Sequence, residues 1–215
     1  MTEYFSIVIP TMWKSSLTVE LLNKFIACDK VKEIIVINND LWKTPTLPDS
    51  DKIIHCMMGV NIYVNPAWNL GASIANHNLI LSNDDIMIEN VDEVLTAILK
   101  SDLEIIGADK RPDDKGKRIK EIKHFPMNGF GTFMYVKNYV NIPDIFKIWI
   151  GDRILFETSE SRGVLKNFGF SGKNGITLNS EGGKLRRTIA LNDKKTRDAL
   201  RKYKLVRQLT TNLQR

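Results

Sequence analysis

The sequence has few cysteines and no long hydrophobic run, and both absences limit what the protein can be. Its 215 residues include only Cys28 and Cys56, too few for the disulfide framework of a secreted scaffold. No segment reaches the roughly 20 consecutive apolar residues that a bilayer-spanning helix needs. The chain also does not open with a charged segment followed by an apolar one, as a secretory signal does. We therefore expect a cytoplasmic protein with no membrane span.

Histidine is scarce as well, and its distribution argues against a zinc site. His55, His77 and His124 fall in different segments with no repeated ligand spacing, so each is expected to be structural or on the surface. Ser15 and Ser16 lack a matching pattern of histidine and carboxylate, which leaves a hydrolase triad unsupported. Zinc chemistry and serine hydrolysis are therefore set aside.

What the sequence does have is apolar material for a core, arranged in two alternating patterns. Hydrophobic residues make up 43% of the chain and include four Trp and nine Phe, enough for one domain. Short β-rich runs predict strands at 5–9, 34–37, 61–64, 79–81 and 103–106. Apolar residues at helical spacing predict helices at 17–25, 68–76 and 91–98. Such repeated units favour an α/β fold with a mostly parallel central sheet flanked by helices.

After residue 107 the pattern becomes less regular. It predicts a charged surface loop, a turn, a strand, a helix and a glycine-rich loop, in this order, at 110–118, 129–132, 133–136, 153–161 and 167–183. Residues 184–215 hold eleven Lys or Arg against two Asp and are expected to be helical. A segment of this charge attracts nucleic acid, anionic lipid or another polyanion, although a solvated charged helix is the commoner explanation.

Polar and turn-forming residues follow four of the predicted strands. These exits are Pro10-Thr11, Asn38-Asn39-Asp40, the stretch from Asn65 to Asn69, and the stretch from Ser82 to Asp85. In parallel α/β sheets, ligands bind beyond the carboxyl ends of the strands. The four exits are predicted to share one edge of the sheet, and that edge carries the candidate site.

Asp84 and Asp85 are adjacent carboxylates directly after an apolar strand. At such a position their charges repel each other and lose hydration, unless a divalent cation compensates them. Mg²⁺ or Mn²⁺ typically takes one or two protein carboxylates and completes its shell with water and substrate phosphates. One interpretation is therefore a metal site for a phosphate-bearing ligand. The other is that the two side chains cap the following turn and helix.

Four motifs, in this order and spacing, resemble GT-A glycosyltransferases of the family 2 type over about residues 5 to 160. They are Ser6-Ile7-Val8-Ile9-Pro10-Thr11, Glu33-Ile34-Ile35-Val36-Ile37-Asn38-Asn39, Asn65-Pro66-Ala67-Trp68-Asn69-Leu70-Gly71 and Ser82-Asn83-Asp84-Asp85-Ile86. The first two resemble strands that end against the nucleotide. The third resembles the family's helix start with Asn and Gly, and the fourth its Asp-x-Asp motif. The resemblance implies a GT-A fold and sugar transfer from a nucleotide-sugar donor, with UDP-sugar favoured.

The resemblance also assigns roles to individual residues. Asp85 is the implied ligand for Mn²⁺ or Mg²⁺, because Asn83 stands where the family has its first Asp. Asn38 stands where many relatives have an Asp at the nucleobase, which leaves base selectivity open. The implied donor contacts are Pro10, Thr11, Asn38, Asn39, Asn65, Asn69, Asn83 and Asp84. We expect a nucleotide-sugar-binding half, an acceptor-side half and a basic helical extension at 1–107, 108–183 and 184–215.

Asp152, in Trp149-Ile150-Gly151-Asp152, is the best match to the carboxylate that inverting family members use to remove the acceptor's proton. Burial beside Trp149 and Phe146 would raise its pKa towards a value useful for a general base. The alternative is that Asp152 is the N-cap of the next helix. The resemblance implies direct displacement, with a metal-neutralised diphosphate as leaving group and no covalent enzyme intermediate.

Small virus- and phage-encoded members of this superfamily are similar to the chain in length and in the stretch from Pro10 to Lys14. They imply the host cytoplasm as location and, as acceptor, a hydroxymethylated DNA base, a capsid glycan or a cell-surface glycan. DNA would be held through phosphate contacts from the basic segment, by Arg186, Arg187, Lys194, Lys195, Arg197, Arg201 and Lys202. The competing hypothesis is a non-catalytic nucleotide- or nucleic-acid-binding module of the same fold, which the presence of Asp85 and Asp152 disfavours.

Overall fold

The computed structural model describes residues 3–40, 42, 46–126 and 129–172. These residues belong to a compact unit that spans Met1–Ile176, while the second unit of the chain, Thr177–Arg215, lies outside the described residues. The predicted basic helical extension at 184–215 and most of the predicted glycine-rich loop fall outside as well. Both stay predictions.

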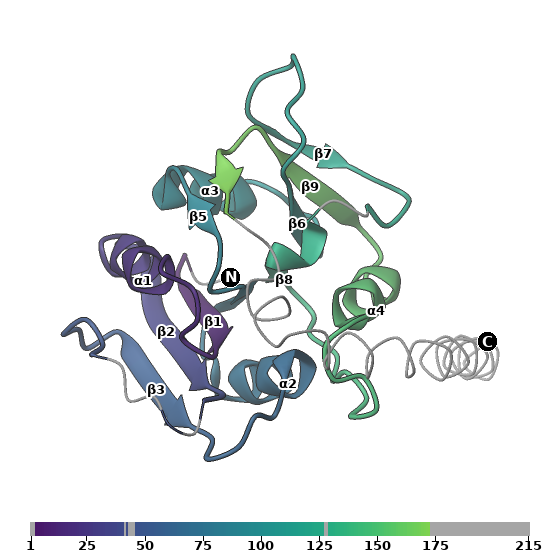
Figure 1. Cartoon of the computed structure of the whole chain (residues 1–215). Coiled ribbons are helices and arrows are strands. Elements are labelled where there is room, and N and C mark those ends of the chain that lie inside the picture. The colour runs from purple at the N-terminus through teal and green to yellow at the C-terminus, as the bar shows by residue number, and fades with distance from the viewer. Residues whose placement is uncertain (1–2, 41, 43–45, 127–128, 173–215) are drawn as a thin grey trace. The chain divides into compact units, whose positions relative to one another are not determined.

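One large sheet forms the centre of the described unit (Figure 1). Its strand order is β3-β2-β1-β4-β8-β6-β9-β7. In chain order these strands are β1 (Phe5–Thr11), β2 (Val31–Asn38), β3 (Ile53–Met57), β4 (Asn78–Ser82), β6 (Ile105–Asp109), β7 (Arg118–Glu121), β8 (Phe133–Val136) and β9 (Arg162–Lys166). The predicted α/β class with a central sheet and flanking helices is confirmed.

The sheet is parallel on one side and mixed on the other. Strands β3, β2, β1 and β4 all run in the same direction. Strand β8 then lies antiparallel to both β4 and β6, so β4 and β6 point the same way. Strand β9 is parallel to β6, and the edge strand β7 is antiparallel to β9. The carboxyl ends of β1, β2, β4 and β6 therefore meet at one edge of the sheet.

Within the described part of the chain, four α-helices cover the two faces of the sheet (Figure 1). Helices α1 (Thr18–Ile26) and α3 (Val91–Leu99) bury Leu21, Phe25 and Val94 in one core cluster with Ile7 of β1. Each such side chain contributes about 1.5–3 kcal/mol when fully buried. Helices α2 (Val64–Ile74) and α4 (Gly151–Thr158) cover the other face, the first of them packing against β1.

The predicted strand at 61–64 is wrong. The third strand is β3, Ile53–Met57, a half-exposed edge strand that pairs only with β2 among the described strands. The residues at 61–64 lead instead into α2, which begins at Val64 rather than at the predicted residue 68. Asn61 Oδ1 accepts a hydrogen bond from the Tyr63 backbone N–H at 2.8 Å, and Tyr63 has a φ of +69°, which an extended strand does not allow.

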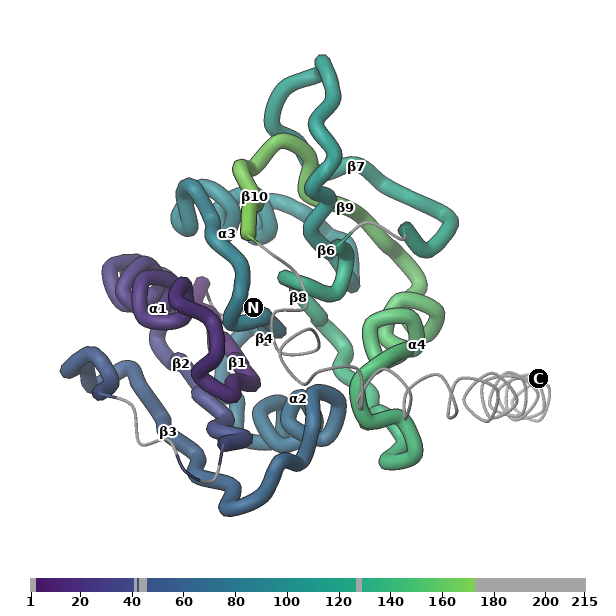
Figure 2. The backbone as a smooth tube through the Cα atoms, viewed as in Figure 1, coloured from purple at the N-terminus to yellow at the C-terminus, as the bar shows by residue number. Residues whose placement is uncertain are grey.

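Smaller differences occur in the second half. Strand β6 ends at Asp109 rather than at residue 106, β7 begins inside the predicted charged loop, and α4 covers Gly151–Thr158 rather than 153–161. The predicted turn at 129–132 contains a short 3-10 helix, η1 (Phe130–Thr132). A two-stranded sheet pairs β5 (Met87–Ile88) with β10 (Phe170–Ser171), which returns the chain to the end of β4 (Figure 2).

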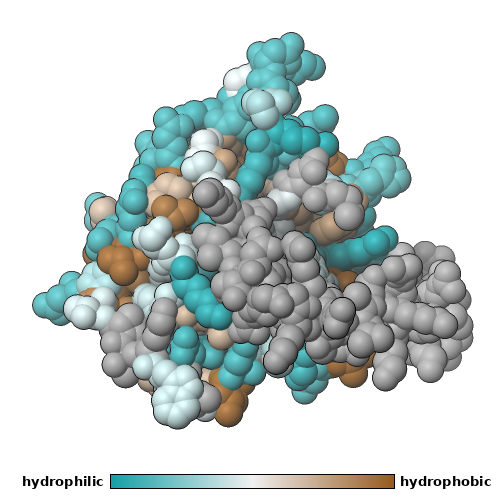
Figure 3. All heavy atoms as spheres, viewed as in Figure 1, coloured by the Kyte–Doolittle hydropathy of each residue, from teal (hydrophilic) through white to brown (hydrophobic). Residues whose placement is uncertain are grey.

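Hydrophilic residues cover most of the described surface visible in Figure 3, with hydrophobic residues in small separate groups. Among the described residues, no helix combines the length and the apolar composition needed to cross a bilayer. Cys28 and Cys56 are both free thiols.

Candidate functional site

The exits of β1, β2 and β4 lie next to each other at the carboxyl edge of the sheet. Thr11 is paired with Asn38 in the β1–β2 register, and the Asn39 backbone N–H donates to the Thr11 carbonyl at 2.8 Å. Strand β4 lies on the other side of β1 and ends at Ser82. Three of the four predicted exits are therefore brought together, and Pro10, Thr11, Asn38 and Asn39 line two of them.

Asp84 is held by the protein itself. The Thr11 hydroxyl donates to Asp84 Oδ2 at 2.5 Å, and the hydroxyl of Thr18, the first residue of α1, donates to the Asp84 carbonyl at 3.2 Å. Burial raises the pKa of Asp84 to about 6, and the neighbouring Asp85 carboxylate adds to this shift. Asp84 is thus fixed against β1 by its own hydrogen bonds. Asp85 is the second carboxylate of the motif.

Asp85 is buried in the turn that follows β4. Gly172 lies against the backbone of this turn: a Cβ built on it would be 2.3 Å from the Asp85 carbonyl oxygen. The φ of Gly172 is +117°, a conformation that glycine adopts without a side-chain clash. Gly172, which follows β10, therefore packs directly against the backbone of this turn.

Asp152 is the second residue of α4, and the N-cap position is occupied by Ile150. The proposed N-cap role is therefore not the one observed, although Asp152 Oδ1 accepts from the Arg153 backbone N–H at 2.8 Å. Burial raises the pKa of Asp152 to about 6. This value suits a group that accepts a proton near neutral pH.

The short helix η1 links Asp152 to the carboxylate motif. A Cβ on Gly131 would lie 2.6 Å from Asp152 Oδ2, so the carboxylate rests directly on this glycine. The next residue, Thr132, accepts a hydrogen bond through its carbonyl from the Asn83 backbone N–H at 2.9 Å. Asn83 and Asp152 thus contact adjacent residues of η1. The backbone of the predicted metal-binding motif and the predicted base are connected through this short helix.

Asn65 and Asn69 lie on α2 rather than at a strand exit. The Asn65 amide donates to the carbonyls of Phe146 and Trp149 at 3.0 and 3.1 Å. The Asn69 amide donates to the Ile142 carbonyl at 2.8 Å, and its oxygen accepts from the Ile142 N–H at 2.9 Å. The two side chains therefore hold the segment that leads into α4. Their predicted contact with the donor stays a prediction.

That segment is tightly constrained just before Asp152. Ile150 has a φ of +75°, which is unusual for a β-branched residue and costs on the order of 1–3 kcal/mol. A Cβ on Gly151 would lie 2.2 Å from Asn65 Oδ1, so only glycine fits there without a shift. The start of α4 is positioned by contacts with α2.

Asn38 and Asn39 differ in how their side chains are used. Asn38 Oδ1 accepts from the Asp40 backbone N–H at 2.9 Å, and its amide contacts Met57 Sδ at 3.1 Å. The Asn39 amide donates weakly to the Tyr63 carbonyl at 3.4 Å. Asn39 Oδ1 is buried, and no described residue donates a hydrogen bond to it. A buried acceptor that lacks a donor costs about 1–3 kcal/mol, and a ligand donor at this position would remove that cost.

Residues at the end of β6 were missed by the sequence analysis, which placed Lys110 in a surface loop and β6 too early. Lys110 is half-buried, and the charge of Asp85 acts on it. Asp109 is buried and forms ion pairs with Lys166 at 3.0 Å and Arg111 at 2.9 Å. These cations lower the pKa of Asp109 to about 2 in spite of its burial. If the strand had been predicted to end at Asp109, the residues after it would have been included among the strand exits of the candidate site.

The donor atoms suit a metal that binds together with a phosphate ligand. Within the described residues, no group of three or more His, Cys, Asp or Glu side chains could hold a metal ion. The Asp84 carboxylate already accepts a hydrogen bond from the Thr11 hydroxyl, so Asp85 is the carboxylate that could hold an ion. Mg²⁺ and Mn²⁺ use one or two protein carboxylates and take the rest of their shell from water and phosphate. The site fits such an ion as part of a donor complex.

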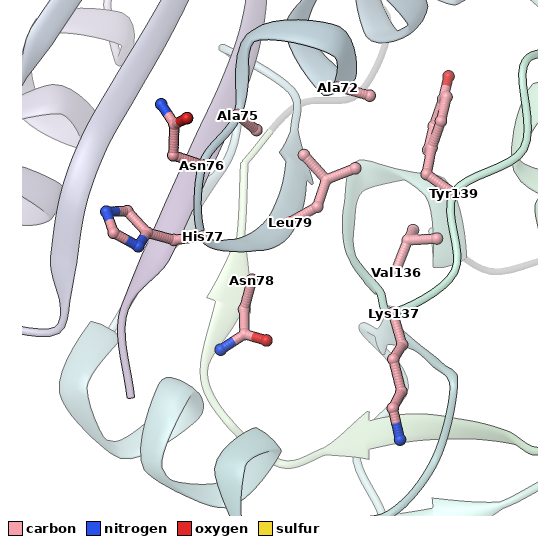
Figure 4. Close-up of a pocket in the computed structure, with 9 residues that line it drawn as sticks. All are labelled: Ala72, Ala75, Asn76, His77, Asn78, Leu79, Val136, Lys137 and Tyr139. Atoms are coloured by element: carbon pink, nitrogen blue, oxygen red, sulfur yellow. The ribbon is translucent and has the colours of Figure 1, made fainter. Parts of the chain in front are cut away.

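A cavity of about 260 Å³ lies at the opposite edge of the sheet, at the amino end of β4 (Figure 4). Leu79 and Val136 point into it, while the His77 ring and the Lys137 ammonium point away from its centre. None of the predicted site residues lines it. The cavity is therefore separate from the candidate site.

Comparison with known proteins gives structural relatives only. No protein-family model and no curated protein matches the chain. Residues 1–349 of S. aureus TarS, solved in complex with UDP-GlcNAc, match with a TM-score of 0.55 and 13% identity over 81% of this chain and 60% of that one. A second structure of S. aureus TarS matches with a TM-score of 0.55 and 13% identity, over 88% and 39%. The chain thus spans less than two thirds of either structure. At this identity the likeness shows the fold, which is that of a GT-A glycosyltransferase.

Proposed function

We propose that the protein is a metal-dependent, inverting glycosyltransferase that moves a sugar from a nucleotide diphosphate donor to an acceptor hydroxyl. One observation carries the proposal: Asn83, two residues before Asp85, donates its backbone N–H to the Thr132 carbonyl, and the Asp152 carboxylate lies against the adjacent Gly131. A GT-A fold with a carboxylate motif and a second buried carboxylate at one edge supports donor binding and base catalysis there.

On the donor side, the chain's own residues hold the nucleotide and the diphosphate. Asp85 is the proposed ligand of Mn²⁺ or Mg²⁺, and Thr11 fixes Asp84 beside it. The bound cation would neutralise charge on the departing diphosphate. Asn39 Oδ1 offers a buried acceptor for a ribose hydroxyl or a nucleobase N–H. The UDP-GlcNAc complex of S. aureus TarS supports UDP-sugars as the first donors to test.

On the acceptor side, Asp152 is the proposed general base. Its carboxylate takes the proton of the acceptor hydroxyl while that oxygen attacks the anomeric carbon, and the bond to the diphosphate oxygen breaks with its electron pair. A single displacement inverts the anomeric centre. A pKa near 6 leaves Asp152 ionised at neutral pH and makes it a stronger base than an exposed Asp.

Calorimetric titration of the full chain with a panel of nucleotide sugars, with and without Mn²⁺, tests the donor side. We expect binding that depends on Mn²⁺, weakens at least tenfold in Asp85→Asn, and persists in Asp152→Asn. Slow hydrolysis of the bound donor would identify the sugar. The proposal fails if no nucleotide sugar binds, or if Asp85→Asn leaves the metal-dependent binding intact.

The acceptor that we propose is a hydroxymethylated base in DNA, and the support is the division of charge along the chain. The first 172 residues carry 19 Lys and Arg against 22 Asp and Glu, whereas residues 173–215 carry 12 against 3. Attraction to a polyanion would therefore depend on the last 43 residues, which lie outside the described part of the structure.

Binding to hydroxymethylated duplexes at increasing salt tests this acceptor. Contacts from about six phosphates predict a loss of roughly 1,000-fold in affinity between 50 and 200 mM salt. Absent or salt-independent binding would remove DNA. Sugar transfer to an oligosaccharide would then assign a capsid or cell-surface glycan. Donor binding without transfer to any acceptor would leave a non-catalytic nucleotide-binding module.

A further inference from the structure

The end of β6 belongs to the same edge as the carboxylate motif. Strands β4 and β6 flank β8 and are both antiparallel to it, so their carboxyl ends point the same way (Figure 1). The β4 exit leads to Asp84 and Asp85, and the β6 exit leads to Asp109 and Lys110. A cation at the second exit is therefore placed near two carboxylates at the first.

The charge of Asp109 is compensated by two cations other than Lys110. Lys166, at the end of the neighbouring strand β9, and Arg111 both form ion pairs with Asp109 Oδ2. The Lys166 ammonium also donates to the Arg111 carbonyl at 3.1 Å. These contacts fix the backbone on both sides of Lys110 and compensate the Asp109 charge.

Lys110 itself is held beside the candidate site by its stem. A Cβ built on Gly129 would lie 3.5 Å from Cγ and Cδ of Lys110, which is ordinary contact distance. The Gly129 carbonyl accepts from the Thr132 N–H at 3.0 Å, and Thr132 in turn accepts from the Asn83 N–H. Burial lowers the pKa of Lys110, and the charge of Asp85 opposes that shift. The ammonium thus lies within the electrostatic reach of Asp85.

A nucleotide diphosphate needs more than one cation at this edge. Asp84 and Asp85 repel its phosphates, and a single divalent ion on Asp85 compensates only part of the combined negative charge. A lysine ammonium acts on phosphate as a compact point charge with three donors. The predicted nucleoside contacts lie at the ends of β1 and β2. Lys110 follows β6, which lies on the other side of β4 in the sheet.

We propose that Lys110 binds the diphosphate of the donor and stabilises it as the leaving group. This inference rests on the proposed function and adds a residue that the family resemblance does not supply. In the free protein the ammonium offsets the charge of Asp85, and in the donor complex it contacts a phosphate oxygen while the divalent cation takes Asp85. The same ammonium thereby compensates negative charge at this edge of the sheet in both states: that of Asp85 in the free protein and that of the diphosphate in the donor complex.

Calorimetric titration with UDP, GDP and the two nucleosides, in Mn²⁺, tests the role of Lys110. We expect Lys110→Met, which keeps the length of the stem, to weaken diphosphate binding about 10- to 100-fold, as the loss of a charge-assisted hydrogen bond predicts. Nucleoside affinity should stay unchanged, because a nucleoside has no phosphate. Lys110→Arg should retain most of the diphosphate affinity. Lys137→Met is the matched control, since it removes the same charge from the opposite edge.

The possible failures are distinguishable. If wild-type protein binds UDP or GDP and Lys110→Met binds it equally well, Lys110 has no role at the diphosphate while the proposed function stands. If Lys110→Met weakens nucleoside and diphosphate binding alike, the residue is structural, and a lowered unfolding temperature would accompany that result. If wild-type protein binds neither diphosphate nor any nucleotide sugar, the proposed function itself is wrong.

Discussion

The two sides of the candidate site are built in different ways. The donor side rests on parallel strands whose residues are buried without interruption, such as Phe5–Thr11, and its polar groups follow at the strand ends. The acceptor side rests on individual contacts: Gly131 beneath Asp152, Asn65 against Gly151, and Ile150 in a left-handed conformation. The comparison shows a regular scaffold beneath the proposed donor side and a locally constrained one around the proposed base. Substitutions should therefore separate the two sides.

The largest separation is expected from Asp152→Asn. Loss of a general base typically lowers the rate about 100- to 10,000-fold, whereas the donor's Kd should change less than threefold. Initial rates and calorimetric Kd values measure the two effects. Because burial of the charged form is unfavourable, the variant should also unfold at a temperature a few degrees higher. A comparable loss in donor affinity would mean that the two sides are not separate.

Asn65→Ala should disturb the acceptor side next most strongly. It leaves the carbonyls of Phe146 and Trp149 without their buried donor, at about 1–3 kcal/mol for each unsatisfied group. Urea unfolding measures the loss, and kcat should fall while donor Kd is kept. Asn138→Ala is the control, because that side chain is exposed and bonds only to Glu104 Oε1 among the described residues. Equal stability of the two variants would remove the positioning role of Asn65.

The pH dependence of the rate gives an effect of about tenfold per unit. Because the pKa of Asp152 is raised to about 6, kcat should be constant above pH 7 and fall as Asp152 is protonated below pH 6. Stability moves the other way: the folded state binds the proton more tightly than the unfolded chain, so this group stabilises the fold at low pH and loses that contribution as pH rises through about 6. A kcat independent of pH between 5 and 7 would exclude Asp152 as the base.

The smallest effect is expected on the donor side from Thr11→Val. The variant removes the hydroxyl that donates to Asp84 and keeps the shape of the residue. A hydrogen bond to a carboxylate of this kind is worth roughly 1.5–3 kcal/mol, but the metal and the phosphates also hold the motif, so the donor Kd should rise only about 2- to 10-fold. Thr11→Ser should behave as wild type. A loss in kcat with an unchanged donor Kd would contradict the assignment of Thr11 to the donor side.

The donor side was largely predictable from sequence, for a physical reason. Fully buried parallel strands are continuous apolar runs, and their polar ends stand out, as at Thr11, Asn38 and Asp84. The exception was β3, because a half-exposed edge strand such as Ile53–Met57 has no such run. The roles assigned to the site residues remain predictions.

The acceptor side was predictable only in outline. Asp152 could be found as a match to a motif, but its support by Gly131 and its link to Asn83 depend on long-range packing that leaves no local pattern. Lys110 was hidden for a related reason. It follows a strand whose end is marked by the charged Asp109, which becomes buried only because Lys166 arrives from β9.

The position of β8 also bears on how the chain folds. This strand, at 133–136, is inserted between β4 and β6, which are complete by residue 109. A fragment that ends at residue 107 would therefore lack the strand that joins its two groups of strands, and would expose the unpaired edge of β4. Contacts of such long sequence separation form late and slow the folding of the sheet. The proposed donor and acceptor sides therefore depend on one sheet that is completed only by residues 133–136.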